Sequence, residues 1–464
     1  MNKLKQIFSS VLMLLILTQQ LAVAQEAISL NIEQAKQFAL EHNKVLKNAR
    51  YDVEFAEKGV WATIAQGLPQ IDGSIGYTDY FNYEIEFNLG GSDSQTPNID
   101  FSKLDEGDWE ILNFLNQMMG GGGASTIQMK NSSTAQVQLT QLIFSGQYLV
   151  GIKMAKIAQQ LSELALESSE NDIIEAVTSS YYVALVTQET SDILDKSIEN
   201  LSNTFKQTEV MVAAGVAEQV DLDQIELAVM MLENTKSQMQ RAIQMSFNLL
   251  RFQLGVSADT EIILTESLDG IIEKINFEAL AGDSFVLDNN PSYKLLQAQE
   301  EITERMLSLE KWSYAPVLAG YYSYNEKILT TDFDMTPKHV AGLNMSIPIF
   351  SSGMRHAKVQ QKKIELEKIK NSRLMVQDQL LMQEKQFRFD LLSAIEQYEL
   401  QKRSIDVAQR VYENTELKYT HGIANSLQLT QASDNYLKAQ NNYISALMNL
   451  LQAKNNFDKL LNNL

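Results

Sequence analysis

The sequence predicts an α+β fold in which long antiparallel coiled-coil hairpins are joined to four β-strands. Two stretches of roughly 65 residues contain no proline, and each corresponds to about 100 Å of continuous helix. A glycine follows each stretch, Gly215 after the first and Gly422 after the second. Between the helical stretches, apolar and polar residues alternate with a period of two, which is the pattern of a β-strand.

The two glycines occupy the same position in two copies of one pattern. AAGVAEQVDLDQIELA (213–228) and THGIANSLQLTQASDN (420–435) both fit G-[VI]-A-x-x-[VL]-x-L-x-Q. After Gly422, apolar residues recur in steps of three and four as far as Phe457, as in a coiled-coil seam. Because glycine adopts positive φ without a steric clash, each glycine predicts a hairpin tip. The predicted hairpins cover about 146–255 and about 353–462.

Four segments predict strands, at about 70–88, 134–144, 316–327 and 338–350. In the first segment, apolar residues fall on odd positions over a length well above the usual five or six residues. An amphipathic sheet has two interpretations. It packs over a soluble core, or it crosses a membrane with its polar face toward a water-filled lumen. Strand length, aromatic clustering and predicted export favour the membrane.

Export is predicted from the N-terminal segment, 1–24, which has the features of a signal peptide. Lys3 and Lys5 precede the apolar core VLMLLIL, and Ala22-Val23-Ala24 matches the small-residue pattern before a cleavage site.

Four strands cannot close a membrane barrel, because the smallest spanning barrels have eight. An open sheet edge within lipid would leave backbone amides without partners. The chain is therefore expected to assemble with copies of itself. Three copies would form a barrel of twelve transmembrane strands, with the helical hairpins forming an α-barrel below it.

A match between the two halves divides the chain into structural repeats, 25–256 and 257–464. The segments QLIFSG (141–146) and IPIFSSG (347–353) mark the same strand-to-helix joint in each repeat. The first repeat carries an insertion at about 89–132 that is rich in glycine and polar residues, which predicts an exposed extracellular loop.

Composition argues against several other classes of function. The net charge of −20 gives no basic footprint for nucleic acid. The absence of cysteine excludes disulfides and thiolate metal sites. The four histidines show no metal-ligand spacing, and no catalytic constellation or phosphate-binding loop stands out. We therefore expect no enzymatic activity, no metal and no cofactor, so that energy for any transport must come from a partner.

The tips LKYTHGIANSLQLTQA (417–432) and VMVAAGVAEQVDLDQIELA (210–228), together with the two strand-to-helix joints, resemble the TolC family of outer-membrane efflux proteins. The resemblance covers essentially all of the predicted mature chain. It implies a homotrimeric exit duct in the outer membrane, serving a multidrug efflux or type I secretion system, whose helical tunnel crosses the periplasm and closes at its tip.

The resemblance also implies partners and residue roles. The tips would engage a periplasmic adaptor, or membrane fusion protein, that links the duct to an inner-membrane pump of the RND or ABC type. The residues that match the docking tips are Gly215, Val216, Ala217, Gly422, Ile423 and Ala424. A plain helix-hairpin turn would need the glycines too, so the tip pattern by itself leaves docking open.

The same resemblance predicts a gate near the tips. Tyr419 and Asp221 match residues that would form a hydrogen bond between the two hairpins. Gln428 and Gln431 stand where the family pattern has acidic residues, and Ala424 stands where it has an arginine, so a cation-selective constriction is in doubt at these positions. Asp221 and Asp223 either supply the charge instead or are solvated carboxylates at a helix start.

Two other classes of function compete with the channel. One is an exported coiled-coil scaffold or adhesin without a pore, and the other is an exported hydrolase. The hydrolase lacks any nucleophile-base pattern. The scaffold is distinguished from the channel by solubility without detergent and by the absence of conductance. The sequence does not identify a cargo.

Overall fold

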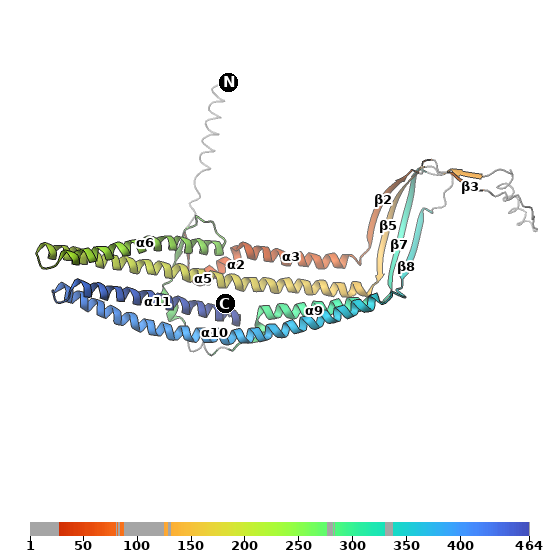
Figure 1. Cartoon of the computed structure of the whole chain (residues 1–464). Helices are drawn as coiled ribbons and strands as arrows, with labels where there is room; N and C mark the ends of the chain where they lie inside the picture. Colours follow the sequence, from red (N-terminus) through yellow and green to blue (C-terminus); the bar gives the residue numbers. More distant parts are fainter. Residues whose placement is uncertain are drawn as a thin grey trace, which may run out of the picture. The chain divides into compact units, whose positions relative to one another are not determined.

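The computed structural model describes residues 27–79, 81, 84–87, 125–128, 131–275, 282, 284–329 and 337–463. The predicted signal segment, 1–24, and most of the predicted insertion, 89–132, lie outside these residues. Figure 1 shows the elements, which in chain order are β1 (Ile28–Leu30), α2 (Ile32–His42), α3 (Lys44–Ala65), β2 (Gln70–Thr78), β3 (Glu84–Phe87), β4 (Ser125–Gln128), β5 (Ser132–Phe144), α5 (Gly146–Ala213), α6 (Gln219–Leu254), β6 (Ile262–Leu264), α7 (Leu268–Glu273), the 3-10 helix η2 (Leu287–Asn289), α9 (Pro291–Trp312), β7 (Val317–Leu329), β8 (His339–Ser346), α10 (Met354–Thr420) and α11 (Ser426–Leu461).

The chain divides into two compact units. The helical unit consists of Met1–Gly59, Met154–Met306 and Gln361–Leu464, and the sheet unit consists of Val60–Lys153 and Leu307–Gln360. Each unit takes segments from both halves of the sequence, because helices and strands from the two halves pack laterally against each other. The division therefore does not follow the repeats predicted at 25–256 and 257–464.

The sheet unit contains an antiparallel sheet with the order β2-β5-β7-β8. Directly paired residues share one face of a sheet. One face therefore carries the row Ile71, Leu139, Tyr322 and Ala341, whereas the other carries Asp72, Gln138, Ser323 and Val340. Among the described residues, no layer covers the apolar face: Ile75 is 78% exposed and Leu343 is 72% exposed. The sheet is thus amphipathic, with its apolar side uncovered.

Both edges of this sheet are open. β2 pairs only with β5, and β8 pairs only with β7, within the residues that the structure describes. Each edge presents a row of backbone N–H and C=O groups to whatever lies beside it.

Two strand boundaries differ from the prediction. The first strand ends at Thr78 rather than near residue 88, and β3 pairs with β4 in a separate two-stranded sheet. Phe81 has a φ of 50°, which interrupts the extended backbone although the alternation of side chains continues. The last strand ends at Ser346 rather than near residue 350, where Pro348 has no N–H for the ladder.

The helical unit contains two antiparallel hairpins, α5 with α6 and α10 with α11. The Lys236–Asp195 ion pair, 2.5 Å long, joins α6 to α5, and Lys459–Asp172, 2.8 Å long, joins α11 to α5. Tyr398 and Tyr412 of α10 contact Tyr443 and Tyr436 of α11, with ring centroids 5.8 and 5.7 Å apart. α5 and α11 thus each have a helix on both sides.

α6 and α10 are less covered than the helices between them. α11 buries most of its apolar residues, whereas α6, which has the same length, buries only Ile225, Ser246, Leu250 and Leu254. Within the part of the chain that the structure describes, no helix has the length and apolar character needed to cross a membrane.

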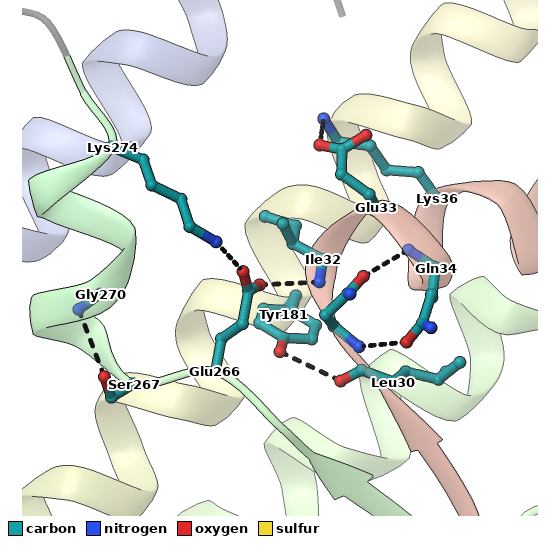
Figure 2. A network of polar contacts seen from close by, with 11 residues as sticks. Leu30, Ile32, Glu33, Gln34, Lys36, Tyr181, Glu266, Ser267, Gly270 and Lys274 are labelled. Atoms are coloured by element: carbon teal, nitrogen blue, oxygen red, sulfur yellow. Dashed lines mark hydrogen bonds and ion pairs between the residues drawn. The ribbon is translucent and has the colours of Figure 1, made fainter.

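Within the helical unit, a polar network joins the N-terminal segment to α5 and to the segment that follows β6 (Figure 2). β1 pairs in parallel with β6, and Tyr181 of α5, which is fully buried, donates a hydrogen bond to the Leu30 carbonyl at 3.2 Å. The Glu266 carboxylate accepts from the Ile32 N–H at 2.9 Å and from Lys274 Nζ at 2.7 Å. Since Ile32 is the first residue of α2, Glu266 supplies an acceptor to an N–H that has no partner within the helix.

Replacing this carboxylate tests its contribution. Burial acts to raise the pKa of Glu266, but Lys274 and the Ile32 N–H outweigh it and hold the pKa below its usual value. We expect Glu266→Gln to destabilise the fold by about 2 kcal/mol at pH 7, the range for hydrogen bonds to charged groups. A lowered pKa stabilises the fold above the ordinary glutamate pKa, so the difference should vanish as pH falls through the lowered value. Melting curves of both proteins between pH 7 and pH 3 measure this, and a constant difference would contradict it.

Candidate functional site at the two hairpin tips

The two tips have the same backbone geometry, 207 residues apart. Gly215 has a φ of 72° and Gly422 a φ of 71°, in the left-handed region that favours glycine. In the first tip, the N–H of Val216 donates to Met211 O at 2.9 Å, and in the second, the N–H of Ile423 donates to Lys418 O at 2.8 Å. This is the bond that closes a helix C-terminus around a glycine. The repeated sequence therefore forms a repeated turn.

The helix that follows each turn is capped in a related way. Asn425 accepts from the N–H of Gln428 at 2.9 Å, and the Gln428 side chain accepts from the N–H of Asn425 at 3.1 Å. In the first tip, the Asp221 carboxylate accepts from the N–H of Glu218 at 3.1 Å. Asp221 and Gln428, both predicted gate residues, are thus also capping residues of α6 and α11.

Apolar side chains are exposed on both turns. Val216 is 70% exposed and Ile423 is 75% exposed, and Val220 and Leu427 in the first turns of α6 and α11 are 59% and 63% exposed. The predicted docking residues therefore place apolar side chains on the surface at the ends of the hairpins. An exposed apolar patch rimmed by polar groups is typical of a protein interaction site.

Just behind the turns, the two hairpins share a buried cluster. Its apolar members are Leu201, Ile225, Tyr412, Tyr419, Leu429 and Ala432. At its centre, the Tyr419 hydroxyl lies 2.7 Å from the Thr208 hydroxyl, and both residues are buried. Thr208 also donates to Thr204 O at 2.9 Å, so Tyr419 is the donor in the bond that joins α10 to α5.

The predicted Tyr419–Asp221 hydrogen bond is wrong. Tyr419 bonds to Thr208, and the Asp221 carboxylate instead accepts a hydrogen bond from the Ser426 hydroxyl. Two separate polar links therefore join the hairpins, one between α5 and α10 and the other between α6 and α11. Thr208 and Ser426 are not among the residues predicted from the sequence. Thr208 continues the buried spacing of Leu201 and Thr204, and the polar threonines at these seam positions were the available signal.

The remaining predicted gate residues take no part in these links. Asp223 accepts from Gln219 within α6 at 2.8 Å. Gln431 lines, together with Gln428, a groove of about 470 Å³ between α10 and α11 that includes Lys418, Ala424 and Leu427.

Several ionisable groups near the second tip have raised pKa values. Burial and the neighbouring Glu413 raise the pKa of Glu416, although a hydrogen bond with Tyr412 acts in the opposite direction. Burial and then Glu416 raise the pKa of Tyr412 to about 12. Among the described residues, no group of three His, Cys, Asp or Glu side chains is placed to hold a metal ion.

A pair of long hairpins with linked tips and an amphipathic sheet with open edges define a subunit of an outer-membrane channel. The chain belongs to the outer membrane efflux protein family, whose profile matches residues 36–256 and 285–463. No curated protein sequence matches it significantly. The family, the fold class and the outer-membrane location with a large periplasmic portion, all predicted from the sequence, are confirmed.

Solved channels share this fold at low sequence identity. The Campylobacter jejuni CmeC outer membrane channel matches with a TM-score of 0.70 and 14% identity, over 93% of this chain and 86% of that one. The Vibrio cholerae outer membrane protein VceC matches with a TM-score of 0.67 and 12% identity, over 93% and 95% of the two chains. The open state of the Neisseria gonorrhoeae MtrE outer membrane channel matches with a TM-score of 0.70 and 13% identity, over 93% and 88%.

Proposed function

We propose that this protein is the passive outer-membrane exit duct of a tripartite efflux or type I secretion system. The observation that carries the proposal is the amphipathic four-stranded sheet, whose two edges have no partner strand in the described part of the chain, in a member of the outer membrane efflux protein family. Such a sheet satisfies its backbone in lipid only when strands of other copies close it. Three copies supply the twelve strands of a closed barrel, so the working unit is a homotrimer.

Rows of exposed apolar side chains, or stripes, on α6 and α10 support self-assembly. On α10, Met375, Met382 and Phe389 recur every seven residues and are 65%, 67% and 68% exposed. On α6, Met231, Met245 and Phe252 continue a heptad register and are 63%, 71% and 71% exposed. A sustained heptad stripe needs a partner helix along its length. Because the two stripes lie on different helices, contacts between copies are head-to-tail, and such contacts make a closed ring when the rotation closes.

The tips support docking to a periplasmic adaptor that connects the duct to an inner-membrane pump. Val216 and Ile423 offer apolar anchors, and the groove beside Lys418 and Gln431 has room for a side chain of a partner helix. Gly215, Ala217, Gly422 and Ala424 build the backbone that presents these anchors. The duct itself binds no nucleic acid, and energy for transport comes from the pump.

The two polar links between the hairpins are the gate that we propose. Tyr419–Thr208 and Ser426–Asp221 hold the hairpins together in the closed tip, and opening separates them. Breaking a neutral buried hydrogen bond costs about 1 kcal/mol, which shifts an opening equilibrium about fivefold.

We therefore expect Tyr419→Phe to raise the open fraction of the channel about fivefold, since the ring remains and only the bond is lost. Tyr412→Phe is the matched control, because Tyr412 is equally buried but its hydroxyl bonds within α10. Single-channel recordings of both variants measure the open fraction. An equal increase in the open fraction of both variants would show that the Tyr419 hydrogen bond does not contribute to the gate.

The duct proposal is tested by reconstitution. The protein is extracted from outer membranes with and without detergent, and the purified protein is added to a planar lipid bilayer. We expect extraction to require detergent and the bilayer to show discrete conductance steps. A protein that dissolves without detergent and leaves the bilayer silent would instead be a scaffold or adhesin.

A further inference from the structure

Exposed apolar side chains surround the place where the sheet meets its helices. The end of β5, the start of β7 and the end of β8 lie together at one end of the strands, because Phe144 pairs with Leu318 and Val317 pairs with Ser346. Next to them, Ile349 is 93% exposed and Phe350 is 84% exposed. We call this set the apolar belt, and its members are Leu68, Phe144, Leu149, Trp312, Tyr314, Ile349 and Phe350.

Cationic side chains follow the belt on three helices. Lys153 lies in the second turn of α5, Lys311 in the last turn of α9, and Arg355 and Lys358 in the first turns of α10. All four lie within about two helical turns, or about 11 Å, of this end of the sheet, where the strands meet the helices. We call these four residues the basic collar. In the sheet unit, the helical segments that carry the collar contain a single acid, Glu310.

The collar is not explained by contacts within the chain. Among the described residues, none of its four cations forms an ion pair. Helix stability does not explain Lys153, Arg355 and Lys358 either, since cations near a helix N-terminus oppose the helix dipole; only Lys311, at the C-terminal end of α9, is favoured by it. No acidic residue occurs from 146 to 162 or from 354 to 364, although the chain has a net charge of −20.

Belt and collar are built on a tightly packed joint. The Tyr148 hydroxyl donates to Ile64 O at 2.8 Å, which ties the start of α5 to the end of α3. A Cβ atom on Gly146 would lie 2.0 Å from the Trp312 ring, so only glycine lets α5 start this close to α9. The backbone that carries the cations is therefore held at a fixed distance from the ends of the strands.

We propose that the basic collar binds the anionic headgroups of phospholipids in the periplasmic leaflet of the outer membrane. The positive charge of the collar is complementary to the negative charge of lipid phosphates. The collar lies one to two helical turns beyond the exposed apolar belt, which is the level at which the phosphates of a bilayer lie. Aromatic residues concentrate at the membrane interface, and clustered Lys and Arg beside a membrane segment attract anionic lipid. The helices are on the periplasmic side, so that leaflet is the one within reach.

The test compares two quadruple variants of the full-length assembled protein. The collar variant carries Lys153→Gln, Lys311→Gln, Arg355→Gln and Lys358→Gln. The control variant removes four exposed cations of the helical unit, Lys196→Gln, Arg241→Gln, Lys385→Gln and Arg410→Gln, and so has the same net charge. Each protein is reconstituted with phosphatidylcholine and phosphatidylglycerol, extracted in mild detergent, and its retained lipids are quantified by mass spectrometry.

We expect the wild type and the control to retain phosphatidylglycerol in preference to phosphatidylcholine, and the collar variant to lose that preference by more than tenfold. The estimate follows from about fivefold per cation near an anionic surface. High salt should weaken the wild-type preference. The proposal fails if the collar variant keeps the preference or the control loses it equally. It also fails if lipid retention is unchanged while conductance or adaptor binding is altered, because the collar then faces the lumen or a protein.

Discussion

Replacing Val216 and Ile423 together by aspartate is expected to weaken adaptor binding by at least about 100-fold while leaving the assembled protein intact. Each side chain is mostly exposed on its turn, so the change removes no packing from the hairpin itself. Burying an apolar side chain of this size contributes about 1.5–3 kcal/mol, and a docked aspartate would also lose its hydration. The loss of two such anchors therefore exceeds 100-fold in affinity.

Binding is measured by surface plasmon resonance with the purified periplasmic adaptor protein. Val286→Asp is the control, because Val286 is 49% exposed in the helical unit, away from the tips. Unchanged affinity in the tip variant would place docking elsewhere. Gly422→Pro should also abolish binding, since proline requires negative φ and lacks the N–H that Gly422 donates to Tyr419 O at 2.9 Å.

Introducing glutamate at Met382 and Phe389 is expected to abolish assembly and conductance. These residues lie in the exposed heptad stripe of α10, where the variant would bury two carboxylates without partners at every contact between copies. The free-energy cost of burying the carboxylates is incurred at every contact of the ring. The chains should therefore remain monomeric in detergent.

The mass of the detergent-solubilised variant is determined by light scattering. The matched control is Gln397→Glu with Gln409→Glu, which adds the same charge to the same helix at exposed positions off the stripe. A variant that still assembles would mean that the stripe of α10 contributes no contact between copies, and a control that fails equally would mean that the effect does not come from the stripe.

The hairpin tips could be predicted because their cause is local. A glycine between long helical patterns requires a turn, and both Gly215 and Gly422 have the positive φ that this implies. The partner of Tyr419 could not be predicted in the same way. Which residue of α5 lies opposite Tyr419 depends on the stagger of the two hairpins, and that is set by packing along their length, including the cluster around Ile225 and Leu429.

The strands, too, could be predicted only in part from the sequence. Alternation correctly identifies the two faces of the sheet, because the period of two belongs to each strand. It does not show where a strand stops, since the positive φ of Phe81 leaves the side-chain pattern unchanged. Ser426 is a further example: after the capping residue Asn425 it has the composition of an ordinary helix start, and only the neighbouring hairpin makes it a partner of Asp221.

In the assembly that we propose, β2 of one copy pairs with β8 of another to complete a ring of three. The natural chain has no cysteine, so introduced thiols are the only ones present. Variants that pair a cysteine at Gly73 or Ile75 on β2 with one at Ala341 or Leu343 on β8 are oxidised in native membranes and separated without reduction. We expect covalent species up to three times the mass of the chain and none larger. Monomers alone in every pair, or a ladder that continues beyond three, would contradict it.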